Sequence, residues 1–165
     1  MKNKTTNVVI AGLGGQGVLK ASDILAEAAF RAGFDVKKSE IHGMSQRGGS
    51  VTSDVRFGEE VFSPMVPQGE ADCLVVLSGD QVENNRHLLR PDGVLIAPDW
   101  IDENALANRR SLNVALLGAL SLFLEMKEET WLEALKTHLP EKYHDLNLRA
   151  FESGRSRAQS RKSLS

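Results

Sequence analysis

Four glycines are clustered near the N-terminus in residues 12–17, GLGGQG, between a short apolar run and a helical pattern. Glycines at a strand-to-helix turn let the backbone approach a phosphate, and the free N–H groups of the helix N-terminus stabilise its charge. The segment satisfies G-x-G-x-x-G, and Glu40 lies 23 residues beyond Gly17, where an acid binds a ribose hydroxyl in dinucleotide enzymes. Any tight turn of this kind favours glycine, so a dinucleotide site and a purely structural turn both stay open.

A second loop, residues 40–50 (EIHGMSQRGGS), combines a guanidinium, an amide, hydroxyl groups and glycines. Arg47 offers a bidentate fork for an anion, and Gly48 and Gly49 expose backbone donors beside it. The same composition suits a rigid loop that docks another subunit. The residues alone favour neither interpretation.

No catalytic or metal-binding set is recognisable elsewhere. Gly79-Asp80 and Asn84-Asn85 use the residue types of a thiamine diphosphate site, but at far too short a spacing. The four histidines lack metal-ligand spacing to cysteines or acids. Cys73 is the only cysteine, so the chain can form no internal disulfide and cannot supply the four thiolates of a usual iron–sulfur cluster. We therefore assign no catalytic residue and no metal ligand.

The composition is that of an ordinary globular domain, with 41% hydrophobic and 25% charged residues in 165. The 20 basic residues are balanced by 22 acidic ones, which argues against a nucleic-acid partner. The apolar run at residues 8–11 is too short for a signal peptide, and no run approaches the length of a membrane span. We expect a cytoplasmic protein without a membrane partner.

The order of apolar runs predicts an α/β fold, a three-layer α/β/α sandwich around a mostly parallel, Rossmann-like sheet. A hairpin over residues 50–62 would make that sheet mixed. A helix is expected over residues 18–32, where small apolar residues recur at helical spacing and Gly33 follows. A shorter helix is expected over residues 81–89. The predicted strands are residues 8–11, 34–41, 50–57, 60–62, 74–77 and 94–97.

The segment 113–124 is apolar on nearly every side, so a helix there must be covered all round. It is either a central core helix or a helix buried against a partner subunit. Two amphipathic segments follow, residues 129–139 and 141–151. We expect one domain over residues 1–152. Residues 153–165 contain five serines, four basic residues and no acid, which predicts a disordered tail.

Several separated blocks resemble the gamma-type domain of 2-oxoacid:ferredoxin oxidoreductases. They are residues 10–18 (IAGLGGQGV), 40–51 (EIHGMSQRGGSV), 113–120 (NVALLGAL) and the segment 140–154. The sequence of the second block most resembles that of the small beta subunit of indolepyruvate:ferredoxin oxidoreductase. The resemblance covers residues 7–154. One departure is the connection from Ala97 to Asn113, which is shorter than is usual in the family.

The resemblance implies a subunit, inactive alone, of an enzyme that oxidatively decarboxylates a 2-oxoacid to an acyl-coenzyme A. Thiamine diphosphate, magnesium and iron–sulfur clusters are then expected on a larger partner subunit, which passes electrons to ferredoxin. A homodimer of the isolated chain stays open. Coenzyme A is the one cofactor that this chain could border. The candidate cofactor-binding residues are Gly12, Gly14, Gly15, Gln16, Gly17, Gln46, Arg47, Gly48 and Gly49.

Two other functions compete with this interpretation. The chain could be a free-standing dinucleotide-binding protein built on residues 12–17, or a purely structural assembly subunit. A dinucleotide-binding protein would explain neither the 45–50 loop nor the 113–120 block, so the enzyme-subunit hypothesis is preferred.

Overall fold

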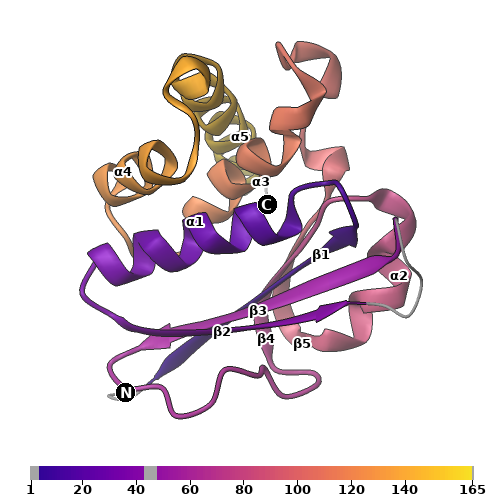
Figure 1. The fold of residues 1–165 in the computed structure, drawn as a ribbon. Helices are drawn as coiled ribbons and strands as arrows, with labels where there is room; N and C mark the ends of the chain where they lie inside the picture. Colours follow the sequence, from indigo (N-terminus) through magenta and orange to yellow (C-terminus); the bar gives the residue numbers. More distant parts are fainter. Residues whose placement is uncertain (1–3, 43–47, 165) are drawn as a thin grey trace.

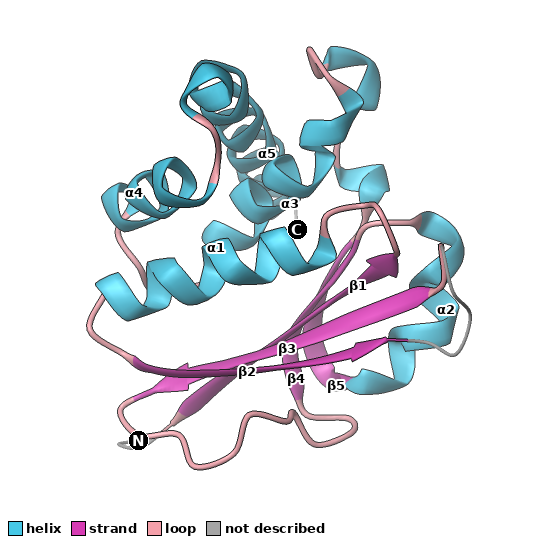
Figure 2. Cartoon of the chain, in the orientation of Figure 1, coloured by secondary structure: helices cyan, strands magenta, loops and turns pink. Residues whose placement is uncertain are grey.

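The computed structural model describes residues 4–42 and 48–164. They form a five-stranded sheet in the order β2-β3-β1-β4-β5, with the longer helices packed on one side of it (Figure 1). The same layering is clear when the chain is coloured by secondary structure (Figure 2). The strands are β1 Thr5–Leu13, β2 Asp35–His42, β3 Ser50–Gly58, β4 Ala71–Val76 and β5 Leu89–Ile96.

The sheet is mixed, and β3 is the one described strand that runs against the others. It pairs antiparallel with both β1 and β2, whereas β4 pairs parallel with β1 and β5. The predicted α/β class is confirmed, and the sheet is mixed, since β1–β4 and β4–β5 are parallel pairs whereas β1–β3 and β2–β3 are antiparallel. The hairpin was placed wrongly, because the strand that pairs with β3 is the preceding β2. Residues 60–62 are loop rather than strand.

Helix α1 (Val18–Arg31) lies along the sheet, as its spacing predicts. Ala21, Ala28 and Ala29 are fully or almost fully buried, so small side chains let the helix approach β1 and β3 closely. The helix ends in a Schellman motif at Gly33, which has a φ of 98°. The N–H groups of Gly33 and Phe34 donate to the carbonyls of Phe30 and Ala29 respectively.

Helix α3 (Leu112–Ser121) is the apolar helix of the sequence, and its residues from Asn113 to Ser121 are all buried. It packs against the sheet, α1 and, most closely, α5 (His144–Leu164). Cover for its apolar sides therefore comes from its own chain, which supports the core-helix interpretation. Helix α4 (Glu128–His138) lies beside α1 and brings Trp131 into the same core.

The end of the chain corrects the predicted disordered tail, because α5 continues without a break to Leu164. Gly154 and Ala158 are buried against the rest of the molecule. Arg155 Nη1 donates to Ser121 Oγ at 2.8 Å, and the Arg161 guanidinium lies 4.2 Å from the centre of the Trp100 ring. The prediction was wrong because the segment is polar in composition, whereas its small residues Gly154 and Ala158 lie on one side of α5 and are buried in the packed structure.

The opposite face of the sheet carries a much thinner layer. A second apolar cluster, built on β1 and β4, is covered by Val82 and Leu88. Helix α2 is confined to Val82–Asn85 between 3₁₀ turns, and Leu89 already begins β5, so the single helix predicted over residues 81–89 is wrong. Within the described residues no helix is both long and apolar enough to cross a membrane.

Candidate functional site

A crevice opens beyond the carboxyl ends of β1 and β4, the two central parallel strands. From β1 the chain passes through α1 to β2 at one edge, and from β4 it passes through α2 to β5 at the other. Ligands of open α/β sheets bind where successive connections diverge in this way. The crevice has a volume of about 670 Å³ and is lined mainly by residues 15–17, 77–79, 109–110 and 112–113, together with Pro98 and Glu103.

The glycine loop between β1 and α1 forms one wall of this crevice. Gly17 has a φ of 86°, and a Cβ atom there would lie 2.5 Å from Asn113 Nδ2, so the position requires glycine on two grounds. Asn113 Nδ2 donates to the Gly17 carbonyl at 3.2 Å. The start of α3 therefore holds the start of α1 in place, a function of Asn113 that the sequence analysis did not identify.

Gln16 stabilises the loop from within. Its Oε1 accepts the N–H of Leu13 at 2.7 Å, while its own N–H donates to the Leu13 carbonyl at 3.1 Å. The side-chain oxygen is thus used to close the turn, so a ligand would meet the Gln16 backbone and amide nitrogen rather than this oxygen. Gln16 is accordingly a positioning residue for the glycine loop.

The structure joins the glycine loop to the second predicted loop. Gly14 N–H donates to the Gly49 carbonyl at 2.8 Å, and a Cβ atom on Gly14 would lie 3.3 Å from Gly48 N. Residues 12–17 and 48–49 therefore form one continuous surface, although they are far apart in sequence. Gln46 and Arg47 lie outside the described residues.

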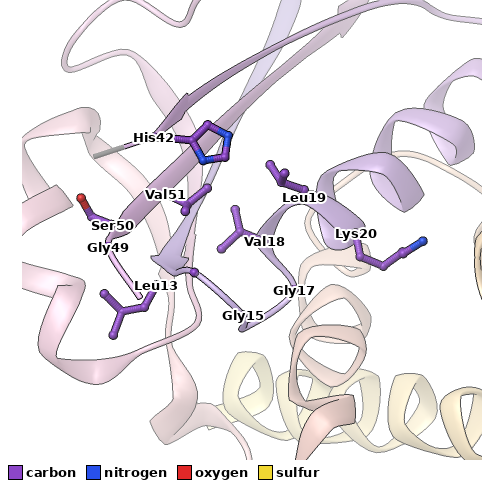
Figure 3. Close-up of a pocket in the computed structure, with 11 residues that line it drawn as sticks. Leu13, Gly15, Gly17, Val18, Leu19, Lys20, His42, Gly49, Ser50 and Val51 are labelled. Atoms are coloured by element: carbon purple, nitrogen blue, oxygen red, sulfur yellow. The ribbon is translucent and has the colours of Figure 1, made fainter. Parts of the chain in front are cut away.

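A smaller hollow of about 430 Å³ lies on the other side of the glycine loop, between the start of α1, the end of β2 and the start of β3. Val18, Val51 and His42 face one another across it, whereas Lys20 points away (Figure 3). Lys20 Nζ instead donates to the His138 carbonyl at 3.2 Å. The mostly apolar lining of this hollow suits an acyl or aromatic group better than a phosphate.

Two adjacent arginines, Arg109 and Arg110, supply the positive charge of the main crevice. They lie on an exposed 3₁₀ turn, where Asn108 Oδ1 accepts the N–H of Arg110 at 2.9 Å. The positive end of the α1 dipole faces the same crevice. Among the described lining residues, Glu103 is the one with an acidic side chain. The sequence analysis missed both arginines, because the segment 98–111 has no periodicity that places it beside the glycine loop.

The fold argues against a dinucleotide site of the usual kind. In that site the acid lies at the end of a strand next to β1, but here β3 separates β2 from β1. Glu40 is therefore two strands away, about 10 Å from β1 at the usual strand spacing. Its carboxylate is also 2.7 Å from Lys38 Nζ, which makes it part of a surface ion pair.

Thiol and metal chemistry find no support in the described part of the chain. Burial raises the pKa of Cys73 to about 12, so its sulfur stays protonated and unreactive at neutral pH. Within residues 4–42 and 48–164 no three His, Cys, Asp or Glu side chains are grouped closely enough to hold a metal ion. The crevice is lined by backbone groups of the glycine loop and by two arginines, which are groups suited to a phosphate or a carboxylate.

An α/β fold with a crevice at the strand divergence is common to a broad class of ligand-binding domains, and comparison with known proteins narrows this class. Residues 7–157 match the family described as pyruvate ferredoxin/flavodoxin oxidoreductase. The chain belongs to this family, and it is homologous to the small subunits of 2-oxoacid:ferredoxin oxidoreductases.

Two curated relatives match along nearly their whole length. Indolepyruvate oxidoreductase subunit IorB of Thermococcus kodakarensis is 37% identical, with 92% of this chain and 95% of the relative covered. The subunit of the same name from Pyrococcus horikoshii is 35% identical with the same coverage. Both alignments run over 193 positions against 165 residues here, so each relative contains segments that this chain lacks.

Solved structures show the same fold. The gamma subunit of a keto/oxoacid ferredoxin oxidoreductase from Geobacter sulfurreducens has a TM-score of 0.79 at 24% identity, covering 95% of this chain and 98% of that one. A 2-oxoglutarate:ferredoxin oxidoreductase from Magnetococcus marinus, solved with coenzyme A bound, also scores 0.79, at 25% identity. There the match covers 96% of this chain but only 32% of the larger one.

Proposed function

We propose that this chain is the small subunit of an indolepyruvate-type 2-oxoacid:ferredoxin oxidoreductase, inactive until it joins a larger subunit. The observation that carries the proposal is the match of 37% identity along 92% of this chain to an indolepyruvate oxidoreductase subunit. The larger subunit would hold thiamine diphosphate, magnesium and the iron–sulfur clusters. It would decarboxylate the oxoacid and pass the electrons to ferredoxin.

We further propose that the crevice borders the coenzyme A that accepts the acyl group. The backbone N–H groups of Gly15 and Gly17, the guanidinium groups of Arg109 and Arg110, and the positive end of α1 together favour a diphosphate. Gly48 and Gly49 would complete the same surface. The apolar hollow beside His42 would then suit the acyl end of the product.

Reconstitution tests the subunit assignment. The chain would be co-expressed anaerobically with the larger subunit encoded in the same genome, and the purified complex assayed for thiamine-dependent reduction of ferredoxin by a panel of 2-oxoacids. We expect coenzyme A-dependent activity, highest with indolepyruvate, from the complex and none from either subunit alone. An isolated chain that binds NADH or FAD with micromolar affinity and forms no complex would contradict the proposal.

Loss of the two arginines should weaken coenzyme A binding in this complex. Each charge-assisted contact to a phosphate contributes about 1.5–3 kcal/mol, so the double variant Arg109→Ala/Arg110→Ala should raise the KM for coenzyme A at least about tenfold. The KM for the oxoacid should stay the same, because the oxoacid would bind at the thiamine diphosphate of the larger subunit, away from Arg109 and Arg110. Steady-state kinetics with each substrate varied in turn measures both values.

Two controls make the coenzyme A test specific. Arg149 is an exposed arginine of α5 outside the crevice, so Arg149→Ala should leave the KM for coenzyme A unchanged. Pantetheine lacks the phosphates, so its KM should be the same for the wild type and the double variant. An unchanged KM for coenzyme A in Arg109→Ala/Arg110→Ala would exclude the crevice as the phosphate site.

A further inference from the structure

The loop that joins β3 to β4, residues 59–70, lies on the side of the sheet away from the longer helices (Figure 1). It contains no helix or strand. A connection of this length without secondary structure is usually functional or flexible. The hydrogen bonds of this loop show whether its backbone is fixed or flexible.

Strand side chains hold the backbone of this loop at regular intervals. One of these side chains, Asp54, is buried. Desolvation raises the pKa of its carboxyl group, and one of its oxygens accepts the N–H of Val66 in the loop. The contacts are Asp35 Oδ2 with Val61 N, Arg56 Nη1 with Ser63 O and Asp54 Oδ2 with Val66 N, each at 2.8 Å, and Asn7 Nδ2 with Glu70 O at 3.1 Å. The β3–β4 loop is therefore a fixed surface element.

This fixed loop presents large apolar side chains to solvent. Phe62 is 83% exposed and Met65 is 54% exposed. Ile41 of β2 is 51% exposed and lies on the same face, because it pairs with Thr52, two residues from the loop anchor Asp54. A rigid backbone that holds exposed aromatic and Met side chains has the character of the anchor region of a protein interface.

The charged residues around these side chains indicate which kind of partner the surface would bind. Glu59, Glu60 and Glu70 are all exposed, and the loop contains no Lys or Arg. A symmetric dimer through this surface would bring the two acidic rims together, which is unfavourable. A complementary partner has an apolar pocket bordered by basic residues.

We propose that Phe62 and Met65, together with Ile41, form the surface that docks the larger subunit of the complex. The inference rests on the proposed function. Relatives in which this fold is only part of a longer chain give it a physical precedent: the match spans 32% of the 2-oxoglutarate enzyme chain and 35% of a ketoisovalerate oxidoreductase subunit from Methanothermobacter thermautotrophicus. In those relatives the domain is covalently joined to further polypeptide.

Paired phenylalanine variants test the surface. Phe62→Ser should weaken the affinity of the chain for the purified larger subunit about tenfold or more, as expected for an interface anchor. Phe30→Ser is the matched control, because Phe30 is 70% exposed but lies on α1, on the other side of the sheet. Its affinity should stay within about twofold of the wild type. Biolayer interferometry with immobilised holo-subunit measures both, after chemical unfolding shows that the variants are folded.

Charge reversal tests the rim separately. The double variant Glu59→Lys/Glu60→Lys should slow association and reverse the salt dependence of the association rate. Glu129→Lys/Glu133→Lys makes the same change in charge on the exposed side of α4 and should alter the rate much less. Equal effects of the two double variants would contradict a docking surface on the β3–β4 loop.

The outcomes separate this inference from the proposed function. If the wild-type chain does not bind the larger subunit, the proposed function fails. If the wild type binds and Phe62→Ser binds equally well, only the docking surface is wrong. If the isolated chain is a dimer in sedimentation velocity and Phe62→Ser makes it a monomer, the surface serves a second copy and the inference is overturned.

Discussion

Replacing Gly154 by alanine should lower the free energy of unfolding by about 3 kcal/mol or more, the upper range for overpacking a core. A Cβ atom at this position would lie 1.7 Å from the Ala115 carbonyl oxygen, so α3 and α5 would have to separate. The intrinsic preference of helices points the other way, because alanine is favoured over glycine by about 1 kcal/mol in a helix interior. The sign of the change therefore reports whether the two helices meet backbone to backbone.

Chemical denaturation of the isolated chain measures the change in the free energy of unfolding. In thermal unfolding, Tm should fall by about 6–12 °C for a chain of this size. Gly79→Ala is the matched control, since nothing lies within 4 Å of its added Cβ atom and its φ is not positive. The control should change the free energy of unfolding by no more than about 0.5 kcal/mol. A Gly154→Ala variant as stable as the wild type would show that α3 and α5 do not cross as described.

Truncation of Trp131 should be equally severe. Its side chain projects from α4 into the hydrophobic core and is fully buried, with its ring 5.8 Å from that of Phe151 on α5. Trp131→Ala would leave a large cavity and lower the free energy of unfolding by about 3–5 kcal/mol. Urea titration followed by circular dichroism gives the value without relying on the fluorescence of the removed indole.

Trp131→Phe separates packing from hydrogen bonding at the same site. Among the described residues the indole N–H of Trp131 has no acceptor, so phenylalanine removes an unpaired buried donor along with part of the ring. We expect a loss of about 1–2 kcal/mol, clearly smaller than for alanine. Equal losses for the two variants would indicate that the indole N–H makes an essential hydrogen bond.

Features specified by local pattern were predictable. The strand at residues 8–11, the helix that follows and its glycine stop each depend on neighbours within a few residues, and all three occur where the pattern places them. The resemblance was equally informative, because the motif residues are short contiguous blocks. The family it indicated is the one to which the chain belongs.

Only part of the candidate site could be predicted from the sequence. The GLGGQG turn and the Gly48-Gly49 pair were identified, and their direct contact through Gly14 and Gly49 follows from β3 lying beside β1. Arg109 and Arg110 were not identified, because their place in the crevice depends on the path of the chain after β5. Nothing in the nearest residues marks that path.

By itself the sequence determined the class of fold, the position of the glycine turn, the apolar helix and the family. Tertiary structure alone decided the insertion of β3 between β1 and β2, which removes Glu40 from the crevice, and the folding of residues 153–164 into α5. The physical reason is the range of the interactions. Helix and strand signals arise between near neighbours, whereas strand order and the α3–α5 crossing depend on contacts between residues far apart in the chain, which no local pattern encodes.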